Sequence, residues 1–448
     1  MDNEKGFGIV DNCAFAGMLI ISAVIGLYIS CKGSKSPEEY SYGESVFETL
    51  TGYPGEVYAN GLQISTMTLG CPLAIIFSSY FILPVLYSLK LTSINEYIEL
   101  RFKSKRLRFV IFLLSMAKVL ASNGIGLYAP TIALSSFTNL STSNSIFILG
   151  IICTIYSSFG GIKAVIWTDV FQFSVILIGF MTVVAVGCAQ NGGLIETLHI
   201  ASEGGRLEMF NMSLSPFVRH TFLNTMAFGF FYQLRMYSLD QVYMQRICTV
   251  NSVKNARRVL KYNIYGKLFV YVLAFSCGLV AYSTYAGCDP MALGLIKKKD
   301  QILPYFVIDK LSFIPGLPGL FIATIIGGSL STLSSTINSC VAMMWKDICQ
   351  KFAFFRNSSD GYATIINKIL CTYIMIVLTL WLAIGGMLYR NKYKMLPFSA
   401  EECTHLNYSS ASNSSIQETV NSTYNLSLTH SIKSHILCNE ALAQCYVF

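Results

Sequence analysis

Long apolar stretches separated by shorter polar segments run along most of this chain. Most are close to the roughly 20 residues that a helix needs to cross the hydrocarbon core of a bilayer. They are continuously apolar rather than alternating, which predicts membrane-spanning helices and not barrel strands. The predicted spans are Val10–Ile29, Ile64–Leu89, Phe109–Leu134, Ile146–Phe159, Val170–Gly187, Thr221–Tyr237, Leu268–Tyr285, Leu317–Trp345 and Ile365–Leu388.

Composition supports an all-α polytopic membrane protein. Of the 448 residues, 53% are hydrophobic and only 12% are charged, and soluble domains carry about twice that share of charge. The first stretch, Val10–Ile29, follows the acidic sequence MDNEK and has no small-residue cleavage site, so we expect a retained helix and not a signal peptide. The net charge of +8 comes from basic loops, so nucleic acid is not a predicted partner.

The basic loops predict how the chain is oriented in the membrane. Lys90–Arg108 and Gln241–Lys261 are rich in Lys and Arg and are therefore expected to be cytoplasmic. Four predicted spans separate them, an even number, so both loops fall on the same side. Continuing along the chain places residues 390–448 outside the cell as a glycosylated polar tail. Its sequons are at Asn407, Asn413, Asn421 and Asn425.

The predicted span Leu317–Trp345 is unusually rich in hydroxyl side chains. Gly328, Ser331, Thr332, Ser335 and Ser339 would share one face of a helix. One interpretation is a small-residue packing face with hydroxyls bonded to the preceding turn. The other is a row of oxygen ligands for a hard cation such as Na⁺. On this segment alone, packing is the simpler explanation.

Two lysines lie inside predicted spans. Lys118 is in mid-span and either reaches the interface or pairs with Glu48, whereas Lys267 lies near the end of its span and should reach the interface. We find no nucleophile, base or metal-ligand constellation, so the chain is not predicted to be an enzyme or to hold a cofactor. A channel is disfavoured because no filter motif is present.

Three segments resemble the sodium:solute symporter family: LTSINEYIELRF (Leu91–Phe102), FGGIKAVIWTDVFQ (Phe159–Gln172) and Cys288–Phe321. The third resembles the monocarboxylate and multivitamin branch most. The resemblance implies a LeuT-like inverted-repeat fold with an extracellular amino terminus. It also implies sodium-coupled symport of a small organic anion, a monocarboxylate or a vitamin-like acid, across the plasma membrane.

The resemblance also assigns site residues, and it turns the balance on the hydroxyl span toward a sodium site. The family's second sodium site matches Gly328 by its carbonyl and Ser331 and Thr332 by their hydroxyls. The other half of that site would lie upstream of the motif TGYPGEVY, Thr51–Tyr58. The remaining implied positions are Tyr42 and Ser45 for Na⁺ and Thr49, Tyr237 and Gln241 for the solute.

The chain departs from the family pattern in two places. An apolar half-helix is missing near Gly43, where polar sequence precedes TGYPGEVY, and a second deletion is expected near Ile376. We therefore expect residues 1–389 to form an incomplete transporter core of about nine to ten spans. The chain thus resembles a shortened member of the family. This leaves an alternative open, in which the protein is a non-transporting truncated isoform or a decayed paralogue.

Overall fold

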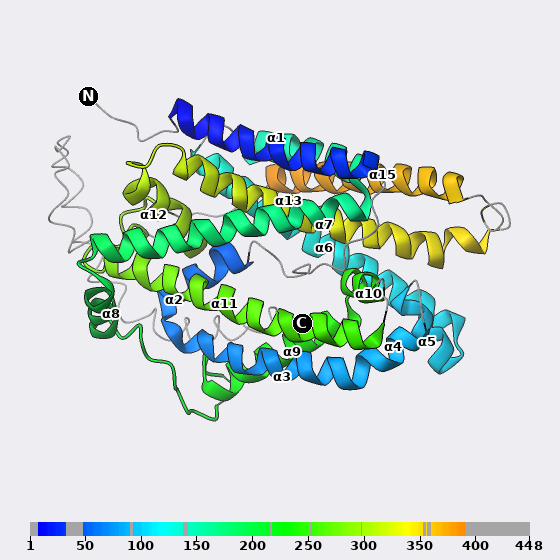
Figure 1. Ribbon diagram of the computed structural model, residues 1–448, viewed down its shortest axis with the longest axis horizontal. Helices are drawn as coiled ribbons and strands as arrows, with labels where there is room; N and C mark the ends of the chain where they lie inside the picture. Colours follow the sequence, from blue (N-terminus) through cyan, green and yellow to red (C-terminus); the bar gives the residue numbers. More distant parts are fainter. Residues whose placement is uncertain are drawn as a thin grey trace, which may run out of the picture. The chain divides into compact units, whose positions relative to one another are not determined.

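The computed structural model describes most of the chain outside the tail. The described residues are 8–32, 48–89, 93–137, 142–215, 217–248, 250, 252–296, 298–352, 355 and 360–389. All of them belong to one compact unit, Met1–Ala400. Within these residues every regular element is a helix (Figure 1), in agreement with the predicted fold class.

The longer helices correspond to the apolar stretches of the sequence. They are α1 (Ile9–Lys32), α3 (Met67–Phe77), α6 (Lys105–Phe137), α7 (Thr142–Gln190), α9 (Phe222–Leu239), α11 (Val253–Tyr285), α13 (Leu317–Asp347) and α15 (Asp360–Tyr389). Shorter elements connect or extend them: η1 (Glu48–Gly52), α2 (Tyr53–Asn60), η2 (Leu62–Thr66), η3 (Ser78–Ile82), α4 (Leu83–Leu89), α5 (Ile94–Phe102), α8 (Leu194–Glu203), α10 (Gln241–Cys248), η4 (Lys299–Gln301), α12 (Ile302–Leu311) and η5 (Cys349–Lys351).

In the part of the chain that the structure describes, five helices have the length and composition of a full membrane span. Two further apolar helices there are shorter, Ile9–Ser22 and Ile365–Leu380. The five are Leu62–Leu89, Lys105–Leu127, Val170–Gln190, Val253–Tyr285 and Leu317–Lys351. The predicted span Thr221–Tyr237 corresponds to α9, an 18-residue helix that includes Asn224, Gln233 and Arg235 and is not among the five.

The sequence predicted a break between Ile146–Phe159 and Val170–Gly187, and this prediction is wrong. Both segments lie in the single helix α7, which has 49 residues. A membrane span needs only about 20 residues, so α7 is longer than a single span requires. Glycine is less favourable than alanine in a helix by only about 1 kcal/mol. The pair Gly160–Gly161 therefore does not end the helix. Near Ile376, where the sequence analysis expects the second deletion, the helix α15 continues without a break.

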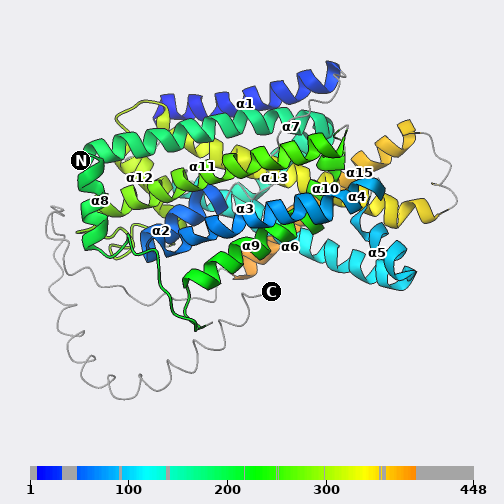
Figure 2. The same ribbon diagram turned by 60° about the horizontal axis from the view of Figure 1, so that its bottom comes forward.

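Helix α13 lies at the centre of one of two apolar clusters. It packs against α1, α6, α7 and α15 (Figures 1 and 2), and 78% of the residues in its most apolar window are buried. The other cluster gathers α2, α3, α11 and α12 against the second half of α7. Helices α7 and α13 therefore connect the two clusters.

The short helix α2 carries a buried carboxylate with several basic partners. The Glu56 side chain is 9% exposed and accepts hydrogen bonds from Arg219 Nε at 3.2 Å, from the His220 ring at 2.8 Å and from Lys299 Nζ. Arg219 and His220 precede α9, and Lys299 opens η4. The cluster thus ties α2, which is outside the five candidate spans, to two loops far away in sequence.

We expect Glu56→Gln to remove a pH-dependent part of the stability. Burial by itself raises the pKa of Glu56, but hydrogen bonds from His220 and Lys299 and the charges of Lys299 and Arg219 outweigh it, so the pKa lies well below its usual range. A depressed folded-state pKa stabilises the protein above the unfolded-state value, and this contribution is lost as pH falls toward the folded-state value. At pH 7 the variant should lose about 3 kcal/mol, the low end for breaking a buried pair because Arg219 is exposed.

Melting of the detergent-solubilised protein at pH 7, 5 and 4 tests this prediction. The difference between wild type and Glu56→Gln should shrink as pH falls below about 4.5, where the unfolded-state carboxyl becomes protonated. Glu196→Gln, at an exposed position in α8, is the control and should change little. A difference that stays constant from pH 7 to pH 4 would show that the carboxylate charge contributes nothing.

Candidate ion and solute site

The hydroxyl face of α13 points into the protein, as both interpretations of the sequence require. Ser331 and Ser339 are each 4% exposed, Ser335 and Gly328 are also buried, and Thr332 is half-buried. Hydroxyls turned toward lipid would have excluded an ion site, because lipid offers them no partners. Their burial keeps the ion-site interpretation open.

Several of these hydroxyls are bonded to their own helix. Thr332 Oγ1 donates to Gly328 O at 3.0 Å, and Ser329 Oγ donates to Ile325 O at 2.9 Å. A hydroxyl that donates its single proton keeps two lone pairs, and a carbonyl oxygen has two as well. The Thr332–Gly328 bond therefore orients two of the three predicted sodium ligands without exhausting either. The packing interpretation is correct for Ser329, and it describes only part of what Thr332 can do.

The guanidinium of Arg246 contacts the hydroxyl face of α13. Arg246 Nη2 donates to Ser335 Oγ at 2.7 Å, from helix α10. This contact occupies the hydroxyl one turn beyond Ser331. The assignment of Gly328, Ser331 and Thr332 to Na⁺ stays a prediction.

The remaining sodium positions of the prediction, Tyr42 and Ser45, lie outside the described residues. Thr49, the predicted solute position, is in η1 and is 8% exposed. Element η1 packs against α2, α11, α12 and η4. Asn407, Asn413, Asn421 and Asn425 also lie outside the described residues, so the predicted glycosylation sites stay predictions.

Tyr237 and Gln241 flank a break in the helix. Asp240, which separates α9 from α10, has extended backbone angles (φ −84°, ψ 124°). Gln241 is buried, and its Oε1 accepts from the backbone N–H of Ile94 at 3.0 Å. Tyr237 is also buried and stacks edge-on against Tyr243, with ring centroids 4.5 Å apart. Both predicted solute positions thus lie at an irregular stretch of backbone.

Lys267 does not reach the interface as predicted. It is 3% exposed, its Nζ donates to Gln233 Oε1 at 2.7 Å, and the same nitrogen lies 5.2 Å from the centroid of the Tyr237 ring. Gln233 in turn donates to Tyr271 OH at 2.9 Å. The sequence showed the position of Lys267 in its span, but not that α9 covers it.

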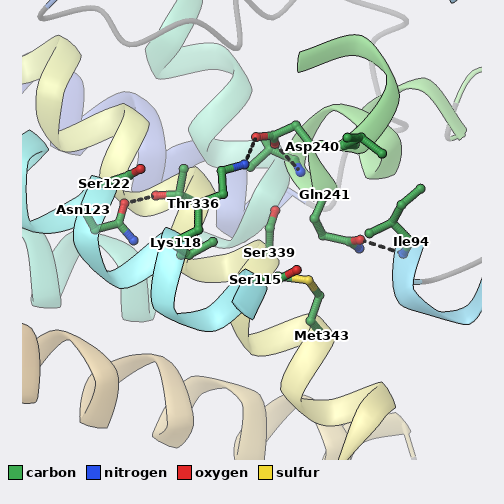
Figure 3. A pocket seen from close by; sticks show the side chains of 13 residues that line it. Ile94, Ser115, Lys118, Ser122, Asn123, Asp240, Gln241, Thr336, Ser339 and Met343 are labelled. Carbon is green, nitrogen blue, oxygen red and sulfur yellow. Dashed lines mark hydrogen bonds and ion pairs between the residues drawn. The ribbon is translucent and has the colours of Figure 1, made fainter. Parts of the chain in front are cut away.

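A cavity of about 80 Å³ lies where α6, α13 and the α9–α10 break meet (Figure 3). Its lining residues are Ile94, Ser115, Lys118, Val119, Ser122, Asn123, Leu239, Asp240, Gln241, Val242, Thr336, Ser339 and Met343. The cavity brings together Gln241, predicted for the solute, and Ser339, from the predicted hydroxyl face. Gly328, Ser331, Thr332 and Tyr237 are not part of its lining.

Lys118 faces an acidic residue in this cavity. Its Nζ is 3.7 Å from Asp240 Oδ2, and this contact is one of the two dashed lines that meet Asp240 in Figure 3. The side chain of Glu48 is outside the described part of the chain, so the predicted Glu48 pair stays a prediction. Sequence reasoning missed Asp240, although an acid directly after the predicted span Thr221–Tyr237 was a usable signal for a partner of a mid-span lysine.

Comparison with solved structures shows which class of fold this is. The chain matches the "Substrate-bound outward-open state of a Na+-coupled sialic acid symporter reveals a novel Na+-site" with a TM-score of 0.74 at 24% identity, over 86% of this chain and 84% of that one. The fold is therefore the LeuT-like fold that the sequence motifs implied.

Comparison with known sequences gives the family. Residues 45–396 match the sodium:solute symporter family. Sodium-coupled monocarboxylate transporter 2 of Bos taurus is 34% identical over 393 residues, 84% of this chain and 63% of that protein. Human sodium-coupled monocarboxylate transporter 1 is 36% identical over 80% of this chain and 62% of its own length, and the human sodium/iodide cotransporter is 35% identical over 76% and 56%.

The chain belongs to the sodium:solute symporter family and is a multi-pass membrane protein. This family consists of transporters and not of enzymes, which confirms the expectation from the sequence. The chain spans about 63% of the length of the first curated relatives that it matches.

Proposed function

We propose that this protein couples the entry of Na⁺ to the uptake of a small organic anion of the monocarboxylate class across the plasma membrane. The observation that carries the proposal is the inward-facing oxygen set of α13, Gly328, Ser331 and Thr332, in a chain of this family. The names of the relatives, two sodium-coupled monocarboxylate transporters, support the choice of solute.

In this mechanism Na⁺ exchanges part of its water shell for the Gly328 carbonyl and the Ser331 and Thr332 hydroxyls. Backbone oxygens near Tyr42 and Ser45 complete the ion site. The solute then binds beside Thr49, Tyr237 and Gln241, and each ligand increases the affinity for the other, as linkage requires. Rocking of one helical repeat against the other exposes both to the cytoplasm.

The sodium gradient and the membrane potential drive the cycle. Each net positive charge that moves inward gains about 2.3 kcal/mol per 100 mV. The amino terminus and the tail with Asn407, Asn413, Asn421 and Asn425 are extracellular in this proposal, and the basic loops Lys90–Arg108 and Gln241–Lys261 are cytoplasmic. No organic cofactor takes part; Na⁺, the solute and the lipid bilayer are the partners.

The test is sodium-dependent uptake of labelled L-lactate, biotin and iodide by cells that display the chain at their surface. Ser331→Ala and Thr332→Ala should each weaken sodium activation at least about tenfold, since even second-shell partners of a metal are worth that much. Ser329→Ala is the matched control, because the Ser329 hydroxyl is bonded to Ile325 O, and its sodium dependence should equal that of wild type.

Two results would contradict the proposal. Uptake that survives the combined Ser331→Ala and Thr332→Ala changes would remove the proposed ion site. Absence of any sodium-dependent uptake by the surface-expressed wild-type chain would favour a non-transporting member of the family.

A further inference from the structure

The cavity between α6, α13 and the α9–α10 break has the chemistry of an anion site. Lys118 contributes a cation, and its side chain is 45% exposed. Its acidic neighbour within 4 Å, among the described residues, is Asp240 at 3.7 Å. Charge-assisted hydrogen bonds between an ammonium and a carboxylate are usually about 2.7–2.9 Å long. Lys118 is thus attracted by Asp240 but is not held in a close hydrogen bond.

Asp240 has a second partner that does not depend on Lys118. Its Oδ1 accepts from the backbone N–H of Val242 at 3.0 Å and caps the start of α10. The Asp240 carboxylate would therefore keep a hydrogen bond if Lys118 moved to another anion. The charged residues that line the cavity are Lys118 and Asp240, so an opening of their contact would leave the ammonium of Lys118 available to an anion.

The wall of the cavity also contains an unsatisfied amide. Asn123 is 3% exposed, and its Oδ1 accepts from Thr336 Oγ1 at 2.5 Å. Its Nδ2 is buried and has no hydrogen-bond partner among the described residues. A buried donor without a partner costs about 1–3 kcal/mol, and a ligand oxygen in the cavity would remove that cost. A cation and an amide donor in one wall are a suitable pair for a carboxylate.

We propose that this cavity is a second solute site, adjoining the first at Gln241, in which the carboxylate of a short-chain monocarboxylate replaces Asp240 as the partner of Lys118. The proposal rests on the proposed function for its place in transport. In the exchange the Lys118–Asp240 contact opens, an ammonium–carboxylate contact to the solute forms, and Asp240 stays bonded to Val242. The cavity volume of about 80 Å³ is sufficient for a small anion such as lactate.

The position of the cavity gives the site its role. Ser339, in its wall, is seven residues beyond Thr332, or about 10 Å along α13 at 1.5 Å per residue. The direction is toward Asp347 and α5, the end that the basic loops make cytoplasmic in the proposed orientation. A solute that leaves the first solute site toward the cytoplasm would pass Lys118. The site is thus an exit station, and its charge pair closes again when the solute departs.

Protection of an introduced cysteine tests the site without requiring transport. Ser115→Cys places a thiol in the cavity lining, and Ser88→Cys in α4 is a control thiol outside it. Both are labelled with a charged thiol reagent in permeabilised cells in the presence of Na⁺, with labelling of the native cysteines subtracted. Saturating L-lactate should slow labelling of Ser115→Cys at least about threefold and leave Ser88→Cys unchanged.

Two charge variants separate a solute site from a merely structural ion pair. Lys118→Met should abolish protection by lactate, and Lys118→Arg should retain it. Asp240→Asn removes the competing anion, so lactate should half-protect at a concentration several-fold lower than in wild type. Equal loss of protection in Lys118→Met and Asp240→Asn would overturn the proposal, as would protection that survives Lys118→Met.

This experiment also distinguishes the two proposals. Protection by lactate in a chain without sodium-dependent uptake would retain the site and reject the proposed function. Uptake of lactate without any protection of Ser115→Cys would retain the function and reject the site.

Discussion

Asp347→Ala is expected to lower the free energy of unfolding by about 3–5 kcal/mol, because it would leave a buried arginine without its main partner. Asp347 lies at the end of α13 and is 2% exposed. Its carboxylate accepts from Arg108 Nε at 3.0 Å, from Arg108 Nη2, from Asn95 Nδ2 at 2.8 Å and from Ser93 Oγ at 3.1 Å. One carboxylate therefore joins the ends of α5, α6 and α13.

The loss is large because the donors would remain buried. Ser93 and Asn95 are fully buried and Arg108 is 9% exposed. Glu99, which accepts from Arg108 Nη1 at 2.6 Å, would become the remaining acidic partner of Arg108 within 4 Å in the described part of the chain. Asp347→Asn should lose less, since an amide oxygen still accepts from Asn95 or Ser93 but carries no charge for the guanidinium.

The measurement is thermal unfolding of the detergent-solubilised chain, followed by size exclusion together with surface expression. Glu96→Ala is a suitable control, because Glu96 lies 3.9 Å from Lys346 and both side chains are partly exposed. Exposed pairs contribute about 0–1 kcal/mol, so this variant should unfold close to wild type. Equal shifts for Asp347→Ala and Glu96→Ala would show that the buried cluster adds no stability.

The sequence predicted the parts of this protein that follow from local pattern. Long apolar runs gave most helices, and the spacing of small and hydroxyl residues gave the inward face of α13, because each depends only on neighbours along one helix. The family motifs gave the fold, which comparison with a solved structure confirms.

What the sequence could not show are partners that the fold brings together. Arg108 and Asp347 are 239 residues apart, and Asp240 reaches Lys118 only because α9 breaks beside α6. Charge rules for membrane topology count Lys and Arg and give little weight to acids, so both aspartates were overlooked. The prediction for Lys267 was wrong because its hydrogen-bond partner, Gln233, lies on another helix. The continuity of α7 through Gly160–Gly161 was not predicted, because glycine only weakly destabilises a helix that packing supports.

Gly229→Ala is expected to destabilise the protein by about 3 kcal/mol or more, the upper end for overpacking. Helices α3 and α9 cross backbone to backbone at Gly70 and Gly229. A Cβ atom on Gly229 would overlap the carbonyl oxygen of Met67, and one on Gly70 would overlap that of Met226. Small residues let helices in a membrane approach this closely. Since the clashing atoms are backbone, neither can rotate away, and the helices must separate.

The helix interior itself would gain from the change, which sharpens the test. Alanine is favoured over glycine in a helix by about 0.8–1 kcal/mol. Gly17→Ala in α1, where a Cβ meets nothing within 4 Å, should therefore be neutral or slightly stabilising in the same melting assay. Gly229→Ala has the same chemistry and should act in the opposite direction. A similar response of the two variants would show that α3 and α9 are not in backbone contact.

The double variant Gly70→Ala, Gly229→Ala tests the same contact from both sides. A single separation of α3 from α9 relieves both overlaps, so its free-energy cost is incurred once. Residues that share one contact are not expected to be additive. The double variant should therefore be destabilised by clearly less than the sum of the two single variants. Full additivity would mean that each alanine is accommodated locally and that the close crossing of the two helices does not contribute to the stability of the fold.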